Sequence, residues 1–215
     1  AEVLNPRRMP ILTTIADLKE SYDAAVTFCE LFEDCPVIIG ESNWGQWRLM
    51  LAILDRYPNA RIECHLFQAN RAVEFLAARY GIGRVLFGSG LLVHSAGAAR
   101  GFVDWSLMDD GAVDRSAGRN LADLLGEGPK RAAEMPANAD ALIREARAAR
   151  PLSIPVLDAH CHVLDEGLNG AGAGYVMIQG DVTNMLELTR RMGVDVTAMM
   201  SWSGPVSMDV ESGNA

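Results

Sequence analysis

Hydrophobic residues recur along the chain in two alternating patterns. Short apolar runs rich in β-branched residues, each followed by Gly or a polar residue, predict buried strands. Longer segments with apolar residues three or four positions apart predict amphipathic helices between those strands. The predicted strands are 36–40, 61–65, 84–87, 154–162 and 194–200, and the predicted helices are 15–32, 47–57, 71–80, 114–125, 138–150 and 182–192.

This alternation is typical of an α/β fold with a parallel sheet. Doubly wound sheets and (β/α) barrels of the TIM type both satisfy it, and periodicity does not choose between them. The pattern changes after Gly126, because residues 127–151 are rich in Ala, Arg and Glu and predict a connector with an exposed helix. Residues 167–174 contain four glycines in eight positions and predict a flexible loop.

Composition narrows the class of protein. With 49% hydrophobic and 22% charged residues, the 215-residue chain is expected to fold. Its net charge of −9 argues against a nucleic-acid partner, which needs cationic side chains against its phosphates. No apolar run approaches the roughly 18 residues of a membrane span, so no membrane partner is expected. The four cysteines form no CxxC pair and predict buried thiols in a reducing, cytoplasmic compartment.

The sharpest chemical signal is the pair His160 and His162 in the sequence Asp158-Ala159-His160-Cys161-His162. Side chains alternate along a strand, so both imidazoles face the same way, about 7 Å apart along it. They lie at the carboxyl end of a predicted strand, where α/β folds place their active sites. Two such imidazoles can share a divalent metal, with zinc favoured and manganese or iron as alternatives. The alternative is a pair of ordinary polar residues at a strand end.

Three further residues are weaker candidates for metal ligands. His65 ends the predicted strand 61–65, and Glu63 shares its face by the same alternation. Glu41 follows the predicted strand 36–40. Each of them is also explained as a polar strand end that faces solvent. His94 is expected at the surface, and neither a GxSxG nor a Walker A sequence occurs.

The segment Leu157–His162 resembles the first-strand HxH motif of the amidohydrolase superfamily, in particular the amidohydrolase-related, metal-dependent hydrolases. Residues 59–63 and 80–90 look like the final two barrel strands of that family, and residues 118–125 are similar to its closing helix. The resemblance implies a parallel (β/α) barrel of the TIM type. It also implies a small-molecule substrate whose carbonyl-type carbon is attacked by metal-activated water, or a related decarboxylation.

The two resembling parts occur in the reverse of the family's order. Residues 1–126 are therefore expected to form the C-terminal half of one barrel, residues 127–151 a connector, and residues 152–215 the N-terminal part of another. A segment of a tandem protein is the favoured interpretation, and a circular permutant or two partial modules are the alternatives. Five predicted strands are fewer than the eight of a barrel, so the chain is expected to belong to an oligomer or a longer chain.

One departure from the family bears on the chemistry. Gly90 stands where many members place a metal-binding or base Asp, and the family's middle-strand histidines have no clear match. The alternative function is therefore a non-catalytic, barrel-derived scaffold or partner-binding module that has lost part of its metal site.

Overall fold

The chain forms two compact units. The computed structural model describes residues 1–128, 137–148, 150–163 and 180–201. The units comprise residues 1–130 and 131–215, so the division falls within the predicted connector 127–151. The glycine-rich segment 167–174 lies outside the described residues.

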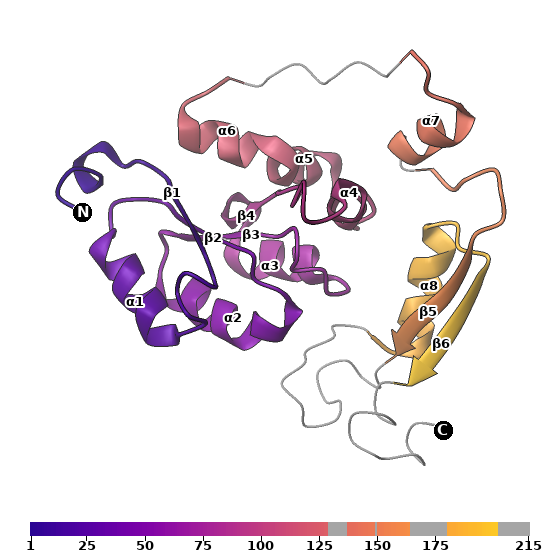
Figure 1. The fold of residues 1–215 in the computed structure, drawn as a ribbon, viewed down its shortest axis with the longest axis horizontal. Coiled ribbons are helices and arrows are strands. Elements are labelled where there is room, and N and C mark those ends of the chain that lie inside the picture. The colour runs from indigo at the N-terminus through magenta and orange to yellow at the C-terminus, as the bar shows by residue number, and fades with distance from the viewer. Residues whose placement is uncertain (129–136, 149, 164–179, 202–215) are drawn as a thin grey trace. The chain divides into compact units, whose positions relative to one another are not determined.

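The first unit is built on a parallel four-stranded sheet (Figure 1). Its strands pair in the order in which they occur along the chain, and every neighbouring pair is parallel. Ile39 lies beside Thr13 on one side and Ile62 on the other. The predicted α/β class with a parallel sheet is confirmed. The strands are β1 (Ile11–Thr14), β2 (Val37–Gly40), β3 (Ala60–Glu63) and β4 (Val85–Leu86).

Helices follow the strands and bury one face of this sheet. The strand residues Val37, Ile39 and Ile62 are fully buried. Trp47 is 2% exposed and stacks on Phe67 with 4.7 Å between ring centroids. The helices are α1 (Tyr22–Leu31), α2 (Trp47–Arg56), α3 (Ala72–Tyr80), α4 (Ala96–Asp104), α5 (Asp110–Asp114) and α6 (Asn120–Leu125), and α4, α5 and α6 gather at the β4 end of the sheet (Figure 1).

The start of the chain differs from the sequence prediction. Strand β1 was not predicted, and helix α1 begins at Tyr22 instead of Ile15. Thr14 closes a turn and not a helix: its hydroxyl accepts a 3.1 Å hydrogen bond from the N–H of Asp17, and its own N–H and hydroxyl donate to Asp17 Oδ2. The helix instead begins after Ser21, whose side chain accepts a hydrogen bond from the N–H of Ala24.

Other helices also differ from the prediction. Helix α4 was not predicted, α7 spans Ala141–Arg147 instead of 138–150, and α3 begins after Arg71, which has a left-handed backbone (φ 57°). The predicted helix 114–125 begins earlier and includes a π turn at residues 115–119 between α5 and α6.

Two asparagine amides tie these helices to the sheet. Nδ2 of Asn59 donates to the carbonyl oxygens of Cys29, Phe32 and Cys35, at 3.1, 3.0 and 3.3 Å. Nδ2 of buried Asn120 donates to the carbonyl of Val85 at 2.9 Å and to that of Ile82 at 2.8 Å. These amides satisfy carbonyls that would otherwise lose their hydrogen-bond partners on folding.

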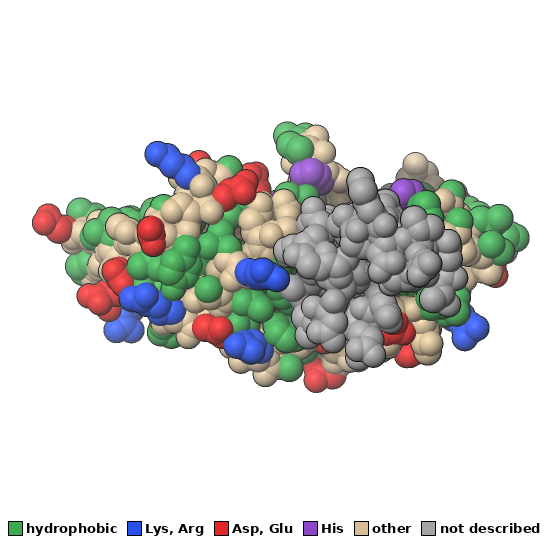
Figure 2. Space-filling view, turned by 90° about the horizontal axis from the view of Figure 1, so that it is seen from below, with side chains coloured by type: hydrophobic (Ala, Val, Ile, Leu, Met, Phe, Trp, Pro, Cys, Tyr) green, Lys and Arg blue, Asp and Glu red, His purple; other side chains and the backbone are tan. Residues whose placement is uncertain are grey.

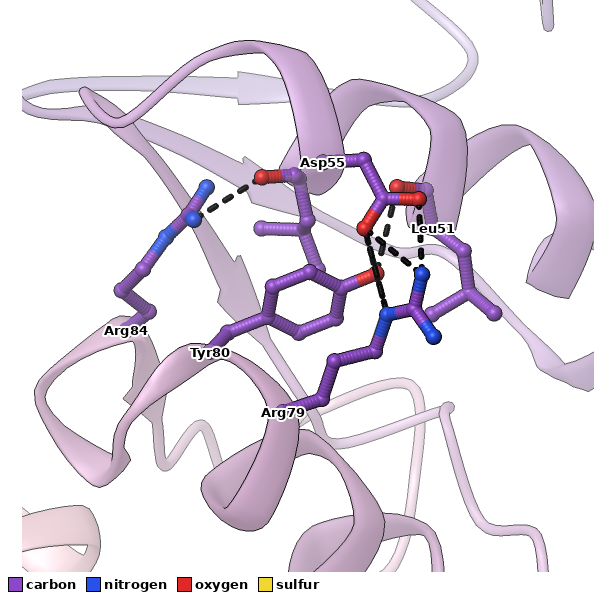
Figure 3. A network of polar contacts seen from close by, with 6 residues as sticks. Leu51, Asp55, Arg79, Tyr80 and Arg84 are labelled. Carbon is purple, nitrogen blue, oxygen red and sulfur yellow. Dashed lines mark hydrogen bonds and ion pairs between the residues drawn. The ribbon is translucent and has the colours of Figure 1, made fainter.

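A polar network joins helices α2 and α3 (Figure 3). Tyr80 Oη donates to Asp55 Oδ1 at 2.8 Å, and Arg79 donates to both oxygens of the same carboxylate. Arg84 lies beside this network and donates to the carbonyls of Leu54, Tyr57 and Ala60 at 2.9, 2.6 and 2.9 Å.

The second unit contains a parallel pair of strands joined through a helix. Strand β5 (Leu157–Val163) pairs with β6 (Val196–Ser201), and α8 (Val182–Arg191) lies between them in the chain. Helix α7 (Ala141–Arg147) precedes this β5-α8-β6 arrangement. The carboxylate of Asp181 accepts a hydrogen bond from the N–H of Asn184 and caps α8.

On the face shown in Figure 2, acidic and basic side chains are interspersed with hydrophobic ones. Among the described residues, none of the helices has the length and the apolar character needed to cross a membrane.

Candidate functional site

His160 and His162 come together at the carboxyl end of β5. Their Nε2 atoms lie 3.0 Å apart, and the two rings meet edge to face with centroids 4.7 Å apart. His160 is exposed and His162 is half-buried. The two ring nitrogens therefore converge at one point, as the alternation of strand side chains predicts.

A β-bulge lies at this point of the strand. The register between β5 and β6 shifts between Asp158 and Cys161, so His160 lies within the irregular segment. Asp158 Oδ1 accepts a hydrogen bond of 2.9 Å from the backbone N–H of His160. Asp158 thus holds the backbone of His160 instead of ending the strand. Cys161 is buried, and burial raises the pKa of its thiol, which is the behaviour of a packing residue.

The spacing of the two nitrogens is close to that of two ligands of one metal ion. Zinc binds imidazole nitrogen at roughly 2.0–2.1 Å, so two nitrogens around one tetrahedral ion lie roughly 3.3–3.4 Å apart. The observed distance between the Nε2 atoms is 3.0 Å, a few tenths of an ångström shorter. Within the part of the chain that the structure describes, no group of three or more His, Cys, Asp or Glu side chains is arranged to hold a metal ion.

Glu63 and His65 form a second polar pair, in the first unit. Glu63 Oε2 lies 2.6 Å from Nδ1 of His65, and Glu63 Oε1 accepts a 2.7 Å hydrogen bond from the backbone N–H of His65. The two side chains are only 14% and 7% exposed. Both oxygens of the carboxylate therefore contact His65, so Glu63 orients the ring and is poorly placed to be a direct metal ligand.

Three glycines leave the space that this pair occupies. A Cβ at Gly88 would collide with the Glu63 carboxylate, and one at Gly40 would lie 3.4 Å from Glu63 Oε2. A Cβ at Gly90 would lie 2.5 Å from Cδ2 of His65, and Gly90 has a φ of 60° that disfavours L side chains. An Asp at position 90 is therefore incompatible with the observed position of His65.

Glu41 and His94 are both exposed at the surface of the first unit. Glu41 is exposed, with a left-handed backbone (φ 57°), and its side chain is not part of the Glu63–His65 pair. His94 is exposed as predicted, but its ring also lies against His65, with 5.4 Å between centroids. Sequence spacing did not indicate this contact, since a turn from Gly90 to His94 creates it.

Cys64, between Glu63 and His65, has a structural role. It is 1% exposed, and burial together with the charge of Glu63 raises the pKa of its thiol to about 12. A thiol with such a pKa is protonated near neutral pH and is a poor nucleophile or metal ligand.

A surface pocket of about 390 Å³ belongs to the first unit. It follows α5, the π turn and α6, where Asp114, Arg119 and Leu125 are among the lining residues. The candidate residues are not among those that line it.

Comparison of the chain with protein-family models, with curated proteins and with solved structures found no match. The site must therefore be interpreted from its own chemistry.

Proposed function

We propose that the chain is part of a metal-dependent hydrolase of the amidohydrolase type that acts on a carbonyl-type carbon of a small molecule. The observation that carries this proposal is the 3.0 Å separation of the His160 and His162 Nε2 atoms at a strand's carboxyl end. A related decarboxylation at the same site is the alternative reaction.

The proposed architecture is the parallel (β/α) barrel of the TIM type, with the first unit as the C-terminal half of one barrel and the second unit as the N-terminal part of another. Support comes from the strand order of the first unit, in which each strand pairs with the next one in sequence. In a barrel, each strand pairs with the next strand in sequence all the way around the ring. In a doubly wound sheet, the strand order reverses at a switch point. The parallel β5-α8-β6 arrangement of the second unit obeys the same rule.

In this proposal the residues of the second unit have distinct roles. His160 and His162 hold the ion through Nε2, and Asp158 fixes the backbone of His160 through its 2.9 Å hydrogen bond. When bound, zinc, or manganese or iron in its place, supplies Lewis-acid activation of water near neutral pH. Buried Cys161 packs on the opposite side of the strand.

Metal content and thermal stability test the assignment together. Purified protein is expected to contain a divalent transition metal, and EDTA is expected to lower its melting temperature, because an ion that binds only the folded state stabilises it. The double variant His160→Ala/His162→Ala is expected to lose both the metal and the response to EDTA.

His94→Ala is the matched control, since it removes an imidazole from the other unit and is expected to retain the metal. A double variant that binds as much metal as the parent protein would contradict the proposal. Loss of the metal from His94→Ala, with the metal retained by His160→Ala/His162→Ala, would also contradict the proposal.

A non-catalytic scaffold is the second candidate, and one observation favours it for the first unit. Gly90 stands where an acidic residue is expected, and His65 occupies the space that an acidic side chain would need. A scaffold predicts that the metal content is negligible and that EDTA leaves the melting temperature unchanged.

A further inference from the structure

We propose that Glu63 and His65 form a metal-independent acid–base site, in which Nε2 of His65 exchanges protons with water during hydrolysis of small acyl esters. The site lies at the carboxyl end of the parallel sheet in the first unit. It does not depend on the metal assigned to His160 and His162.

The geometry selects one nitrogen of His65 as the reactive one. An ionised carboxylate only accepts hydrogen bonds, so in neutral imidazole the 2.6 Å contact with Glu63 Oε2 places the proton on Nδ1. Nε2 then keeps its lone pair. A carboxylate that orients an imidazole and stabilises its protonated form in this way is a recurring arrangement in hydrolytic enzymes.

The surroundings of Nε2 are shaped by a tight turn. A Cβ on Gly90 would lie 3.1 Å from Nε2, so a side chain there would cover the nitrogen. The carbonyl of Gly90 accepts hydrogen bonds from the N–H groups of Val93 and His94, at 3.2 and 2.7 Å. The turn thereby carries the ring of His94 to 5.4 Å from that of His65, measured between centroids.

The same turn holds a strained backbone. Leu92 is fully exposed and has φ 81°, a conformation that a residue with a Cβ adopts at a cost. The exposed apolar residues Leu91 and Val93 flank Leu92 and give the edge of the site an apolar surface.

The proposed step transfers one proton in each direction. Nε2 of His65 takes a proton from water while the water oxygen forms a bond to the acyl carbon of the ester. The bond between this carbon and the alcohol oxygen then breaks, and the imidazolium returns the proton to the departing alkoxide. Ester and water become acid and alcohol, with Glu63 as the positioning residue.

Hydrolysis of p-nitrophenyl acetate by the full chain in excess EDTA tests the proposal. EDTA removes the contribution of the metal site, so failure of one proposal leaves the other intact. His65→Ala is expected to lower the residual rate by about 10²-fold, the lower end of what acid–base catalysis contributes. The control for Glu63→Gln is Glu33→Gln, which makes the same change at an exposed carboxylate outside the proposed site. This control is expected to leave the rate unchanged.

Separate values of kcat and KM distinguish positioning by Glu63 from a merely structural role. Glu63 contacts His65 from β3, and the ring of His94 lies against it from the turn after β4. Glu63→Gln is expected to lower kcat with little change in KM, because an amide accepts the Nδ1 proton of His65 less strongly than a carboxylate does. A destabilised variant with unchanged kcat would assign Glu63 a structural role only and would contradict its positioning role.

Long-range ¹H–¹⁵N NMR of the parent protein supplies a readout that does not depend on folding of a variant. The proposal expects the proton of neutral His65 on Nδ1. A predominant Nε2–H tautomer would overturn it, as would a folded His65→Ala variant that retains the EDTA-resistant rate.

Discussion

The hydroxyl of Tyr80 donates a 2.8 Å hydrogen bond to Asp55 Oδ1 and so links helix α3 to helix α2 (Figure 3). Arg79 donates to the same carboxylate. The hydrogen bond from Tyr80, followed by the contact with Arg79, lowers the pKa of Asp55 below its usual value of 3.8. Burial and the same Asp55 contact raise the pKa of Tyr80 to about 12.

This relationship predicts a dependence of stability on pH. Since the pKa of Asp55 is lower in the folded state, its ionised form stabilises the fold above the unfolded pKa, and this contribution is lost as the pH falls through the folded pKa. The Asp55 side chain is 47% exposed, so the contribution is below about 1 kcal/mol. Tyr80→Phe is expected to lower the free energy of unfolding at neutral pH and to weaken its decline toward about pH 3. Urea denaturation at several pH values measures both effects, and an identical decline in parent and variant would contradict the prediction.

The amide of Asn120 predicts a larger loss of stability. Asn120→Ala removes two hydrogen bonds and leaves the buried carbonyls of Ile82 and Val85 without this donor. We expect the free energy of unfolding to fall by about 2 kcal/mol, as measured by urea denaturation. Asn138→Ala, at an exposed asparagine, is expected to change it by less than about 0.5 kcal/mol. Equal effects of the two substitutions would be inconsistent with the role given to Asn120.

A side chain at position 88 is expected to disturb the Glu63–His65 pair by steric collision. A methyl group at this position collides with the Glu63 carboxylate. Gly88→Ala is therefore expected to displace Glu63 from His65 and to destabilise the fold by about 1–3 kcal/mol, the range for overpacking. At Gly118 an added Cβ meets no atom within 4 Å, so Gly118→Ala is the matched control and is expected to be neutral or stabilising. The ¹⁵N shifts of the His65 ring report the displacement, and unchanged shifts in Gly88→Ala would refute it.

Burial of the cysteines is expected to make their reaction with thiol reagents slow. All four are free and buried, and burial raises the pKa of Cys29 to about 11 and that of Cys64 to about 12. Because the thiolate is the reactive species, Cys29 and Cys64 are expected to resist a disulfide reagent near pH 7 in the native protein. All four thiols are expected to react after unfolding in urea. Mass spectrometry of the labelled protein identifies the sites, and rapid native labelling of Cys64 would contradict the burial described above.

Hydrophobic periodicity predicted most of the elements but not the first strand. Strands β2, β3, β5 and β6 and helices α2 and α8 lie within two or three residues of their predicted limits. Strand β1 has only four residues, two of them threonines that also suit a helix cap. Its place at the sheet edge comes from pairing with β2, a contact that no local pattern encodes.

The sequence predicted which site residues share a face of a strand, but not which of their atoms make contact. Alternation placed Glu63 with His65, and His160 with His162, because residues two apart on a strand share a face. It did not indicate that both oxygens of Glu63 contact His65, or that Gly88 and Gly90 make room for the pair. It also did not indicate the register shift between Asp158 and Cys161, or the 3.0 Å distance between the two imidazole nitrogens.

The sequence by itself determined the α/β class, the parallel strands and which residues are candidates for the chemistry, because these follow from short-range periodicity and residue type. Only the tertiary structure decided which polar atoms meet. The carboxylate of Glu63 contacts His65 through both of its oxygens, and the turn from Gly90 brings His94 to the same ring. The physical reason is that hydrogen bonds need positions accurate to a few tenths of an ångström, and such positions are set by strand register, bulges and the space left at glycines.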